Sequence, residues 1–307
     1  MNQALLGHAS PLAKIFFSLF VILVSTVVFL IVGFVAGILI FDIKLSELGN
    51  VLSNLNNITS LNLMRFLQIS QSIGLFIVPP IVLGYFFQKS SSQYLKMNIT
   101  PKAKTLILTF LIMIFALPLI NLLGELNSKI LLPDFLSSME HWMKEKEAEA
   151  LKITEAFLNV KTVAGFWLNV FMIAVIPAVG EELLFRGVLQ RLFSEWFKNI
   201  HYGIILSAIL FSAMHMQFYG FFPRMLMGVL FGYLFYWSSN IWIPILAHFT
   251  NNMLAVIVSF FISNGSINKS AETFGSSSDT LIYVLFSILG VFVLLLLFYR
   301  KERRLIN

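Results

Sequence analysis

The chain contains no cysteine and little charge. Without cysteine it can form neither disulfides nor thiol-ligated metal sites. Only 12% of its 307 residues are charged, whereas ordinary globular domains carry about a quarter. Together with a mean hydropathy of +0.86, this composition excludes an ordinary soluble domain and predicts an integral membrane protein. The net charge of +6 is interpreted as an orientation signal, and no nucleic-acid partner is expected.

Long apolar runs dominate the sequence instead. A helix needs about 20 residues to cross the hydrocarbon core of a bilayer. The first run, from Ile15 to Phe41, is too long for the core of a signal peptide, so we expect it to span the membrane. The runs predict an all-α, polytopic membrane protein with about eight transmembrane helices. They cover residues 15–41, 66–87, 105–123, 163–185, 202–217, 221–238, 241–262 and 280–299. The fourth should continue as helix to about residue 197.

Basic residues indicate the orientation. The loop 88–104 carries four lysines and no acid, and the tail after Tyr299 is also basic. Eight spans place both segments on one side, which the positive-inside rule assigns to the cytoplasm. We therefore expect both termini to be cytoplasmic and the lipid partner to be a bacterial cytoplasmic membrane.

Four regions follow from this arrangement. Residues 1–125 form the N-terminal transmembrane helices. Residues 126–162 form a charged extracytoplasmic loop, which is rich in helix formers and should contain a helix lying in the membrane interface. Residues 163–262 form a helical core, and residues 263–307 form the last transmembrane helix with a basic cytoplasmic tail.

Polar side chains gather on three spans of the core, where ionisable groups are costly and therefore functional candidates. They are Glu181, Glu182 and Arg186 on the fourth span, His215 on the fifth, and His248 and Asn252 on the seventh. Similar depths along these helices predict one cavity between the fourth, fifth and seventh spans.

The spacing of these residues predicts their division of labour. Glu182 and Arg186 are four residues apart and can form an ion pair on one helix face. Glu181 is turned about 100° away, which leaves it without that partner. His248 and Asn252 are also four apart, as are Phe211 and His215, whose aromatic ring could wall the site. Taken singly, a membrane histidine is more often a packing residue and a Glu–Arg pair a structural clamp; only their convergence favours a shared site.

Three motifs resemble those of a known family. "EELLFR" from Glu181, "FSAMH" from Phe211 and "HFTNN" from His248 are similar, in order and spacing, to the EExxxR, FxxxH and HxxxN motifs of the CPBP (Abi/CAAX protease) intramembrane proteases. The likeness runs from about Pro177 to Asn252. It implies a membrane-embedded endopeptidase with Glu181, His215, His248 and Asn252 as catalytic residues, acting on a membrane-associated peptide or protein.

Two chemical schemes remain open. Zinc or another divalent metal could be held by Glu181, His215 and His248, because a zinc hydrolase needs about three protein ligands and an open position. Alternatively, Glu181 activates water with help from His215, while His248 and Asn252 donate hydrogen bonds to the oxyanion. Glu182, Arg186 and Phe211 then support the site, which is expected to open toward the cytoplasm.

Two other functions compete with a peptidase. A non-catalytic immunity or scaffold membrane protein would use the same cavity to bind a peptide or partner. A transporter would use the buried glutamates and histidines to relay protons. Pure binding needs no carboxylate–histidine cluster, and the chain shows no convincing internal repeat of the kind many transporters have.

Overall fold

The described residues, 4–303 of a computed structural model, form helices joined by short connections, with no β-strand among them. Residues 1–3, which begin the predicted N-terminal region, and residues 304–307, which end the predicted basic tail, lie outside the described residues. Seven helical stretches of this part of the chain are long and apolar enough to cross a membrane. They are Pro11–Ile40, Ile58–Gln88, Ala103–Ser128, Val163–Phe197, Phe218–Ser238, Trp242–Ser263 and Ile282–Glu302. The predicted all-α, polytopic membrane class is confirmed.

Several spans are composed of consecutive helical segments. The α-helices within them are α1 (Pro11–Ile40), α3 (Ile58–Ser72), α4 (Val78–Gln88), α6 (Ala103–Ser128), α8 (Val163–Asn169), α9 (Ile176–Leu184), α10 (Gln190–Phe197), α12 (Phe221–Ser238), α13 (Trp242–Ser263) and α14 (Ile282–Arg303). The remaining α-helices are α2 (Leu48–Ser53), α5 (Ser91–Tyr94), α7 (Ser137–Leu158) and α11 (Ile200–Ala213).

The fifth predicted span is shorter than expected, so the described residues contain seven apolar helices of full spanning length and one shorter apolar helix, Ile200–Ala213. Helix α11 ends at Ala213 rather than at residue 217 and has 14 residues, a length of about 21 Å against a hydrocarbon core of about 30 Å. Its end has a visible cause. The Nδ1 atom of His215 bonds the carbonyl oxygen of Phe211 at 2.9 Å, which is the acceptor that the backbone N–H of residue 215 would use in a continuing helix.

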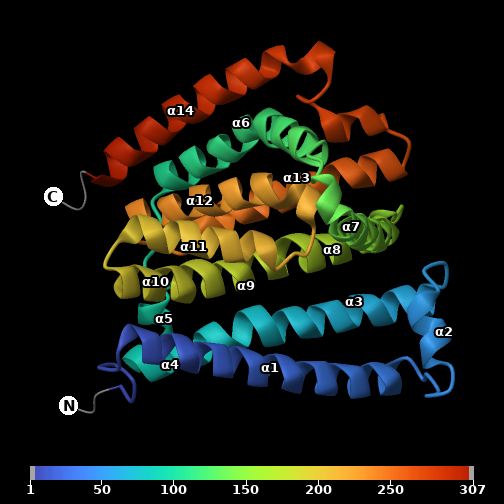
Figure 1. Cartoon of the computed structure of the whole chain (residues 1–307), viewed down its shortest axis with the longest axis horizontal. Helices are drawn as coiled ribbons and strands as arrows, with labels where there is room; N and C mark the ends of the chain where they lie inside the picture. Colours follow the sequence, from blue (N-terminus) through green and yellow to red (C-terminus); the bar gives the residue numbers. More distant parts are fainter. Residues whose placement is uncertain (1–3, 304–307) are drawn as a thin grey trace.

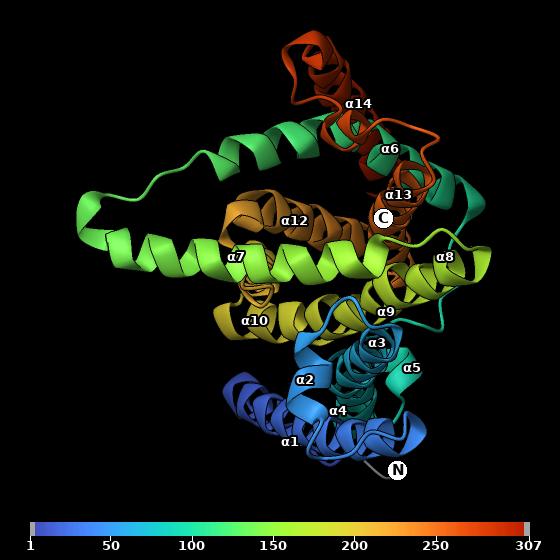
Figure 2. The same ribbon diagram turned by 90° about the vertical axis from the view of Figure 1, so that its right-hand side faces the viewer.

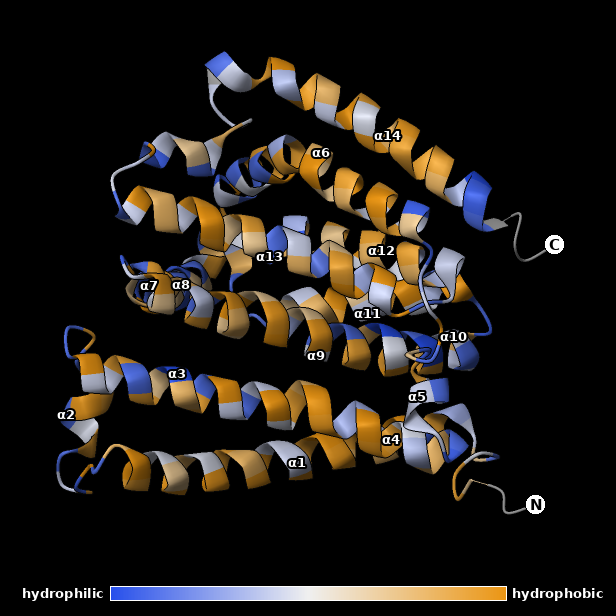
Figure 3. Cartoon of the chain, turned by 180° about the vertical axis from the view of Figure 1, so that it is seen from behind, coloured by the Kyte–Doolittle hydropathy of each residue, from blue (hydrophilic) through white to orange (hydrophobic). Residues whose placement is uncertain are grey.

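The helices stack in layers with both termini at one end (Figure 1). The α8–α10 stretch lies in the middle, with α1, α3 and α4 on one side and α11 to α13, α6 and α14 on the other. Helix α5 and the end of α10 lie near the termini, whereas α2 and α7 lie at the opposite end. Hydrophobic residues cover the outer helices, and hydrophilic ones concentrate at helix ends and connections (Figure 3). This distribution is the one expected for a bundle surrounded by lipid.

Helix α7 crosses the bundle instead of joining it (Figure 2). This orientation agrees with the predicted interfacial helix, but part of its apolar face contacts protein. The Phe157 side chain is buried, and its carbonyl oxygen accepts a bond from Nη2 of Arg65 at 3.1 Å. The Trp142 ring lies 5.4 Å from that of Phe218. Helix α7 thus covers the connection between α11 and α12.

Candidate active site

Two π-helical turns bracket the glutamate pair. Helix α9 follows the turn Val170–Val175 and precedes the turn Phe185–Leu189. A π-helical turn contains one extra residue relative to an α-helix, frees a backbone carbonyl and occurs frequently at functional sites. Here, the carbonyl oxygen of Phe185 accepts the backbone N–H of Gln190 and also the hydroxyl of Ser207 on α11, the latter at 3.0 Å. The two turns therefore set how Glu181 and Glu182 face the neighbouring helices.

The predicted ion pair between Glu182 and Arg186 is present and fully buried. The Nη1 atom of Arg186 lies 3.0 Å from Oε1 of Glu182, and its Nη2 atom donates to the carbonyl oxygen of Gly228 on α12 at 3.0 Å. The guanidinium also lies 4.8 Å from the ring centre of Phe211. Gly228 permits close packing of α12 on α11, because a Cβ atom there would meet Ala208 at 3.0 Å. Arg186 thus joins α9, α11 and α12.

His248 connects α13 to both glutamates. Its Nδ1 atom donates to Oε1 of Glu182 at 2.8 Å, and its Nε2 atom lies 3.9 Å from Oε2 of Glu181. A carboxylate only accepts hydrogen bonds, so the proton is on Nδ1 and Nε2 is directed at Glu181. The imidazole stacks on Phe231, with ring centres 5.4 Å apart. This contact of His248 with Glu182 could not be derived from sequence spacing.

His215 lies on the turn 214–217 after α11, not on the helix. Because a carbonyl oxygen can only accept, Nδ1 of His215 must donate its proton to Phe211, which leaves Nε2 for other contacts. The Phe211 ring lies 5.2 Å from the His215 ring and 5.8 Å from the His248 ring. Phe211 therefore walls both histidines, as its spacing from His215 suggested.

Asn252 contacts the fourth span rather than a histidine. Its Nδ2 atom donates to the carbonyl oxygen of Ile173, within the first π-helical turn, at 3.0 Å. Its Oδ1 atom accepts from Asn251 at 3.1 Å. A side-chain amide has two N–H donors, so one remains for a substrate. The bond to Ile173 shows that Asn252 also fixes α13 against the helix that carries the glutamates.

Glu181, His215 and His248 are the residues that the metal-dependent scheme requires as ligands. Among the described residues, no three histidine, aspartate or glutamate side chains gather closely enough to hold a metal ion. The Nδ1 atom of His248 is directed at Glu182 and that of His215 at Phe211. These contacts leave the Nε2 atom of each histidine available, as both the metal-free and the His₂Glu schemes require.

One charged residue near the site escaped the sequence reasoning. Arg224 lies one turn into α12, within an apolar span, and contacts the residue Gln217 on the turn that carries His215. The signal was available, because an arginine inside an apolar run is a functional candidate by default. The π-helical turns gave no comparable signal in the sequence.

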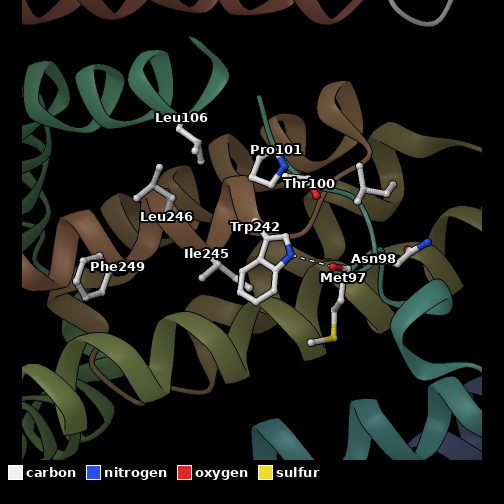
Figure 4. Close-up of a pocket in the computed structure, with 10 residues that line it drawn as sticks. Met97, Asn98, Thr100, Pro101, Leu106, Trp242, Ile245, Leu246 and Phe249 are labelled. Carbon is white, nitrogen blue, oxygen red and sulfur yellow. Dashed lines mark hydrogen bonds between the residues drawn. The ribbon is translucent and has the colours of Figure 1, made fainter. Parts of the chain in front are cut away.

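Two pockets lie beside the cluster. One, of about 460 Å³, lies between α6, α13 and the segment 97–101, where Nε1 of Trp242 donates to the carbonyl oxygen of Met97 at 3.0 Å (Figure 4). Its lining holds no ionisable side chain. The second, of about 550 Å³, is lined by residues 212–213 and 216–217 beside His215 and by Trp142 and Met143 of α7. Because α7 lies opposite the termini, this pocket does not support the expected opening at the end that carries them.

Comparisons with known proteins agree with the three motifs. The family described as "Type II CAAX prenyl endopeptidase Rce1-like" matches residues 163–254, which contain the whole cluster. A Bacillus subtilis protein named "Uncharacterized protein YpbD" is 28% identical over 85 residues, 26% of this chain and 40% of that protein. A second from the same organism, named "Putative membrane peptidase YdiL", is 26% identical over 105 residues, 34% of this chain and 42% of that protein.

The matched region is limited in extent. It spans about two fifths of the length of these curated relatives, and no solved structure matches the chain. The family match nevertheless coincides with the part of the molecule in which α9, α11 and α13 bring the EExxxR, FxxxH and HxxxN residues together. Residues 163–254 of this integral membrane protein therefore resemble the type II CAAX prenyl endopeptidase Rce1-like family in sequence and in the three motifs.

Proposed function

We propose that the protein is an intramembrane endopeptidase that hydrolyses a peptide bond of a membrane-associated protein or peptide with a water molecule activated by Glu181. The observation that carries this proposal is the difference between two adjacent carboxylates. Oε1 of Glu182 accepts from both Arg186 and His248. Oε2 of Glu181 is buried without a hydrogen-bond partner among the described residues and lies 3.9 Å from His248.

Glu181 is the general base in this scheme. It takes a proton from water, whose oxygen attacks the carbonyl carbon of the substrate while the carbonyl electron pair moves to the oxygen. The protonated Glu181 then gives this proton to the amide nitrogen as the C–N bond breaks, and the products are a carboxylic acid and an amine. The unshared electron pair on Nε2 of His215, whose Nδ1 proton is directed at Phe211, orients the water or accepts its proton.

The oxyanion that forms from the substrate carbonyl oxygen requires hydrogen-bond donors. The second N–H of the Asn252 amide is one candidate, since the first is directed at Ile173. His248 is the other. Its Nδ1 proton is already directed at Glu182, so it donates through Nε2 only as the doubly protonated imidazolium. Preorganised donors of this kind are usually the largest single contribution to acyl-transfer catalysis.

The test is cleavage of a peptide library by the purified protein in detergent micelles. We expect products from the wild type and none from Glu181→Gln at the same melting temperature. Cleavage that persists in Glu181→Gln would remove Glu181 as the base. Peptides retained by the wild type but never cleaved would favour the non-catalytic immunity or scaffold function instead.

A further inference from the structure

The turn that carries His215 contains a strained residue. Met216 adopts a left-handed backbone conformation, with φ of 52°. Residues other than glycine avoid this region, and such strain persists only where the surroundings fix the conformation. Backbone bonds from His215 to Ser212 at 3.3 Å and from Met216 to Ala213 at 3.1 Å hold the first part of the turn. These two bonds do not restrain the residue after Met216, so a further contact is needed there.

Arg224 holds that second part with both ends of its guanidinium. Its Nη1 atom donates to Oε1 of Gln217 at 2.9 Å, and its Nη2 atom donates to the carbonyl oxygen of the same residue. Gln217 directly follows the strained Met216. A planar guanidinium that binds two acceptors fixes orientation as well as distance. The bond pair therefore restrains the backbone on the far side of the left-handed residue.

The chain makes space for this contact. Gly220 lies against the guanidinium, and a Cβ atom at this position would lie 2.8 Å from Nη1 of Arg224. The preceding residue, Tyr219, is tied to α7, because its backbone N–H donates to Oε2 of Glu147 at 3.3 Å. The segment between α11 and α12 is thus fixed at Gln217 by α12 and at Tyr219 by α7.

The charge of Arg224 is costly at this position. Within the described part of the chain, no carboxylate lies close enough to Arg224 for a salt bridge, Glu147 and Glu181 interact with it only at longer range, and its Nε atom is buried without a hydrogen-bond partner. An arginine within an apolar span is expensive unless it serves a function. Gln217 is neutral, so its two hydrogen bonds do not offset the charge of Arg224 as a paired acidic side chain would in a buried ion pair. The placement favours a role in the adjacent turn.

We propose that Arg224 is a positioning residue of the active site, which holds the turn 214–217 so that the His215 imidazole stays against Phe211. Its importance for catalysis rests on the proposed function, but its action on the turn does not. The two can therefore be tested separately, first by the mobility of the turn and then by turnover.

The mobility test uses a spin label at Met216→Cys, which is unique because the chain has no cysteine and accessible because Met216 is 50% exposed. We expect the nitroxide spectrum to become more mobile in Arg224→Met and in Gly220→Ala, and less so in Arg224→Lys. Arg65→Met is the matched control, because it removes another arginine bond to a backbone carbonyl, that of Phe157, away from the turn. Its spectrum should stay that of the parent.

An unchanged spectrum in Arg224→Met would overturn the proposal whether or not the protein is a peptidase. If this variant does not accumulate, Gln217→Ala keeps the charge, removes one acceptor and decides the same question. The turnover test follows for any peptide that the wild type cleaves. A misplacement of about 1 Å can cost about 10²-fold in rate. We therefore expect kcat to fall by about this factor in Arg224→Met, with KM and melting temperature retained and partial rescue by Arg224→Lys. A mobile turn with unchanged kcat would overturn the catalytic part alone.

Discussion

The Nδ1 atom of His248 donates to the same oxygen of Glu182, at 2.8 Å, that the guanidinium of Arg186 contacts at 3.0 Å. One carboxylate oxygen thus joins α13 to α9, and Arg186 extends the connection to α12 through Gly228. All three side chains are buried. The neighbouring Glu181 approaches this network only through Nε2 of His248, at 3.9 Å, and we therefore propose different tasks for the two glutamates.

Replacing the two glutamates one at a time should separate stability from turnover. Glu182→Gln weakens both bonds to Oε1 and leaves Arg186 without a counter-charge, and breaking a buried ion pair typically costs about 3–5 kcal/mol. We expect a lower melting temperature and less folded protein. Glu181→Gln is the matched control and should keep the melting temperature while it abolishes peptide hydrolysis. Equal melting temperatures for the two variants would contradict this division.

Arg186 should not be replaceable by lysine. A lysine ammonium is a point charge and cannot reproduce the planar fork that reaches both Glu182 and the carbonyl oxygen of Gly228. We expect Arg186→Lys to lose stability, though less than Arg186→Ala, in thermal unfolding of the detergent-solubilised protein. Arg65→Lys provides a comparison at a buried arginine outside the cluster. A melting temperature unchanged in Arg186→Ala would refute the clamp.

Asn252 should matter more for rate than its neighbour. Loss of one oxyanion donor lowers kcat by about 10²–10³-fold, so Asn252→Ala should reduce kcat by this factor with KM retained. Some stability should also be lost with the bond to Ile173, about 1 kcal/mol for a typical hydrogen bond. Asn251→Ala is the control, because it removes only a bond to Asn252. Full activity in Asn252→Ala at reduced stability would assign Asn252 a structural role alone.

Metal removal separates the two chemical schemes. If Glu181 activates water without a metal, hydrolysis should survive a chelator and elemental analysis of active protein should find no stoichiometric metal. His215→Ala and His248→Ala should then lose rate without any change in metal content. Stoichiometric zinc that disappears in both histidine variants, but stays in Asn252→Ala, would establish the His₂Glu scheme instead.

The orientation in the membrane can be mapped with single cysteines. We expect Ser92→Cys, on the short helix α5 within the lysine-rich connection, to be protected from an impermeant maleimide in intact cells. Ser266→Cys, after α13, should react, since the two positions lie at opposite ends of a membrane-spanning helix arrangement. Permeabilised cells provide the control, in which both must react. If only Ser92→Cys were labelled in intact cells, the protein would have the opposite orientation in the membrane.

Local periodicity accounts for the features that the sequence predicted well. Span positions follow from apolar runs, and the Glu182–Arg186 pair and the Phe211–His215 contact both follow from a four-residue spacing on a helix. These relationships need no knowledge of how helices pack. The same reasoning failed at His215 itself, because it assumed that the helix continues to residue 217.

The contacts that give the site its chemistry are between helices. The bonds from His248 to Glu182 and from Asn252 to Ile173 join residues 66 and 79 positions apart. They depend on the crossing of α13 over the fourth span and on the π-helical turn that places the Ile173 carbonyl. Neither can be read from spacing. Arg224 was missed for a different reason, because its partner Gln217 lies on a turn where a helix was expected.

Because of the π-helical turn Val170–Val175, the direction in which Glu181 and Glu182 face depends on the number of residues in the fourth span. It contains one residue more than a regular helix would, and each residue of an α-helix rotates the chain by about 100°. Deletion of a single residue there would leave a continuous, well-bonded helix. It would nevertheless rotate the part of the helix after the deletion by about 100° relative to α8. Glu181 and Glu182 would then no longer face His248. The number of residues before the glutamates therefore specifies the active site as strictly as their identity does.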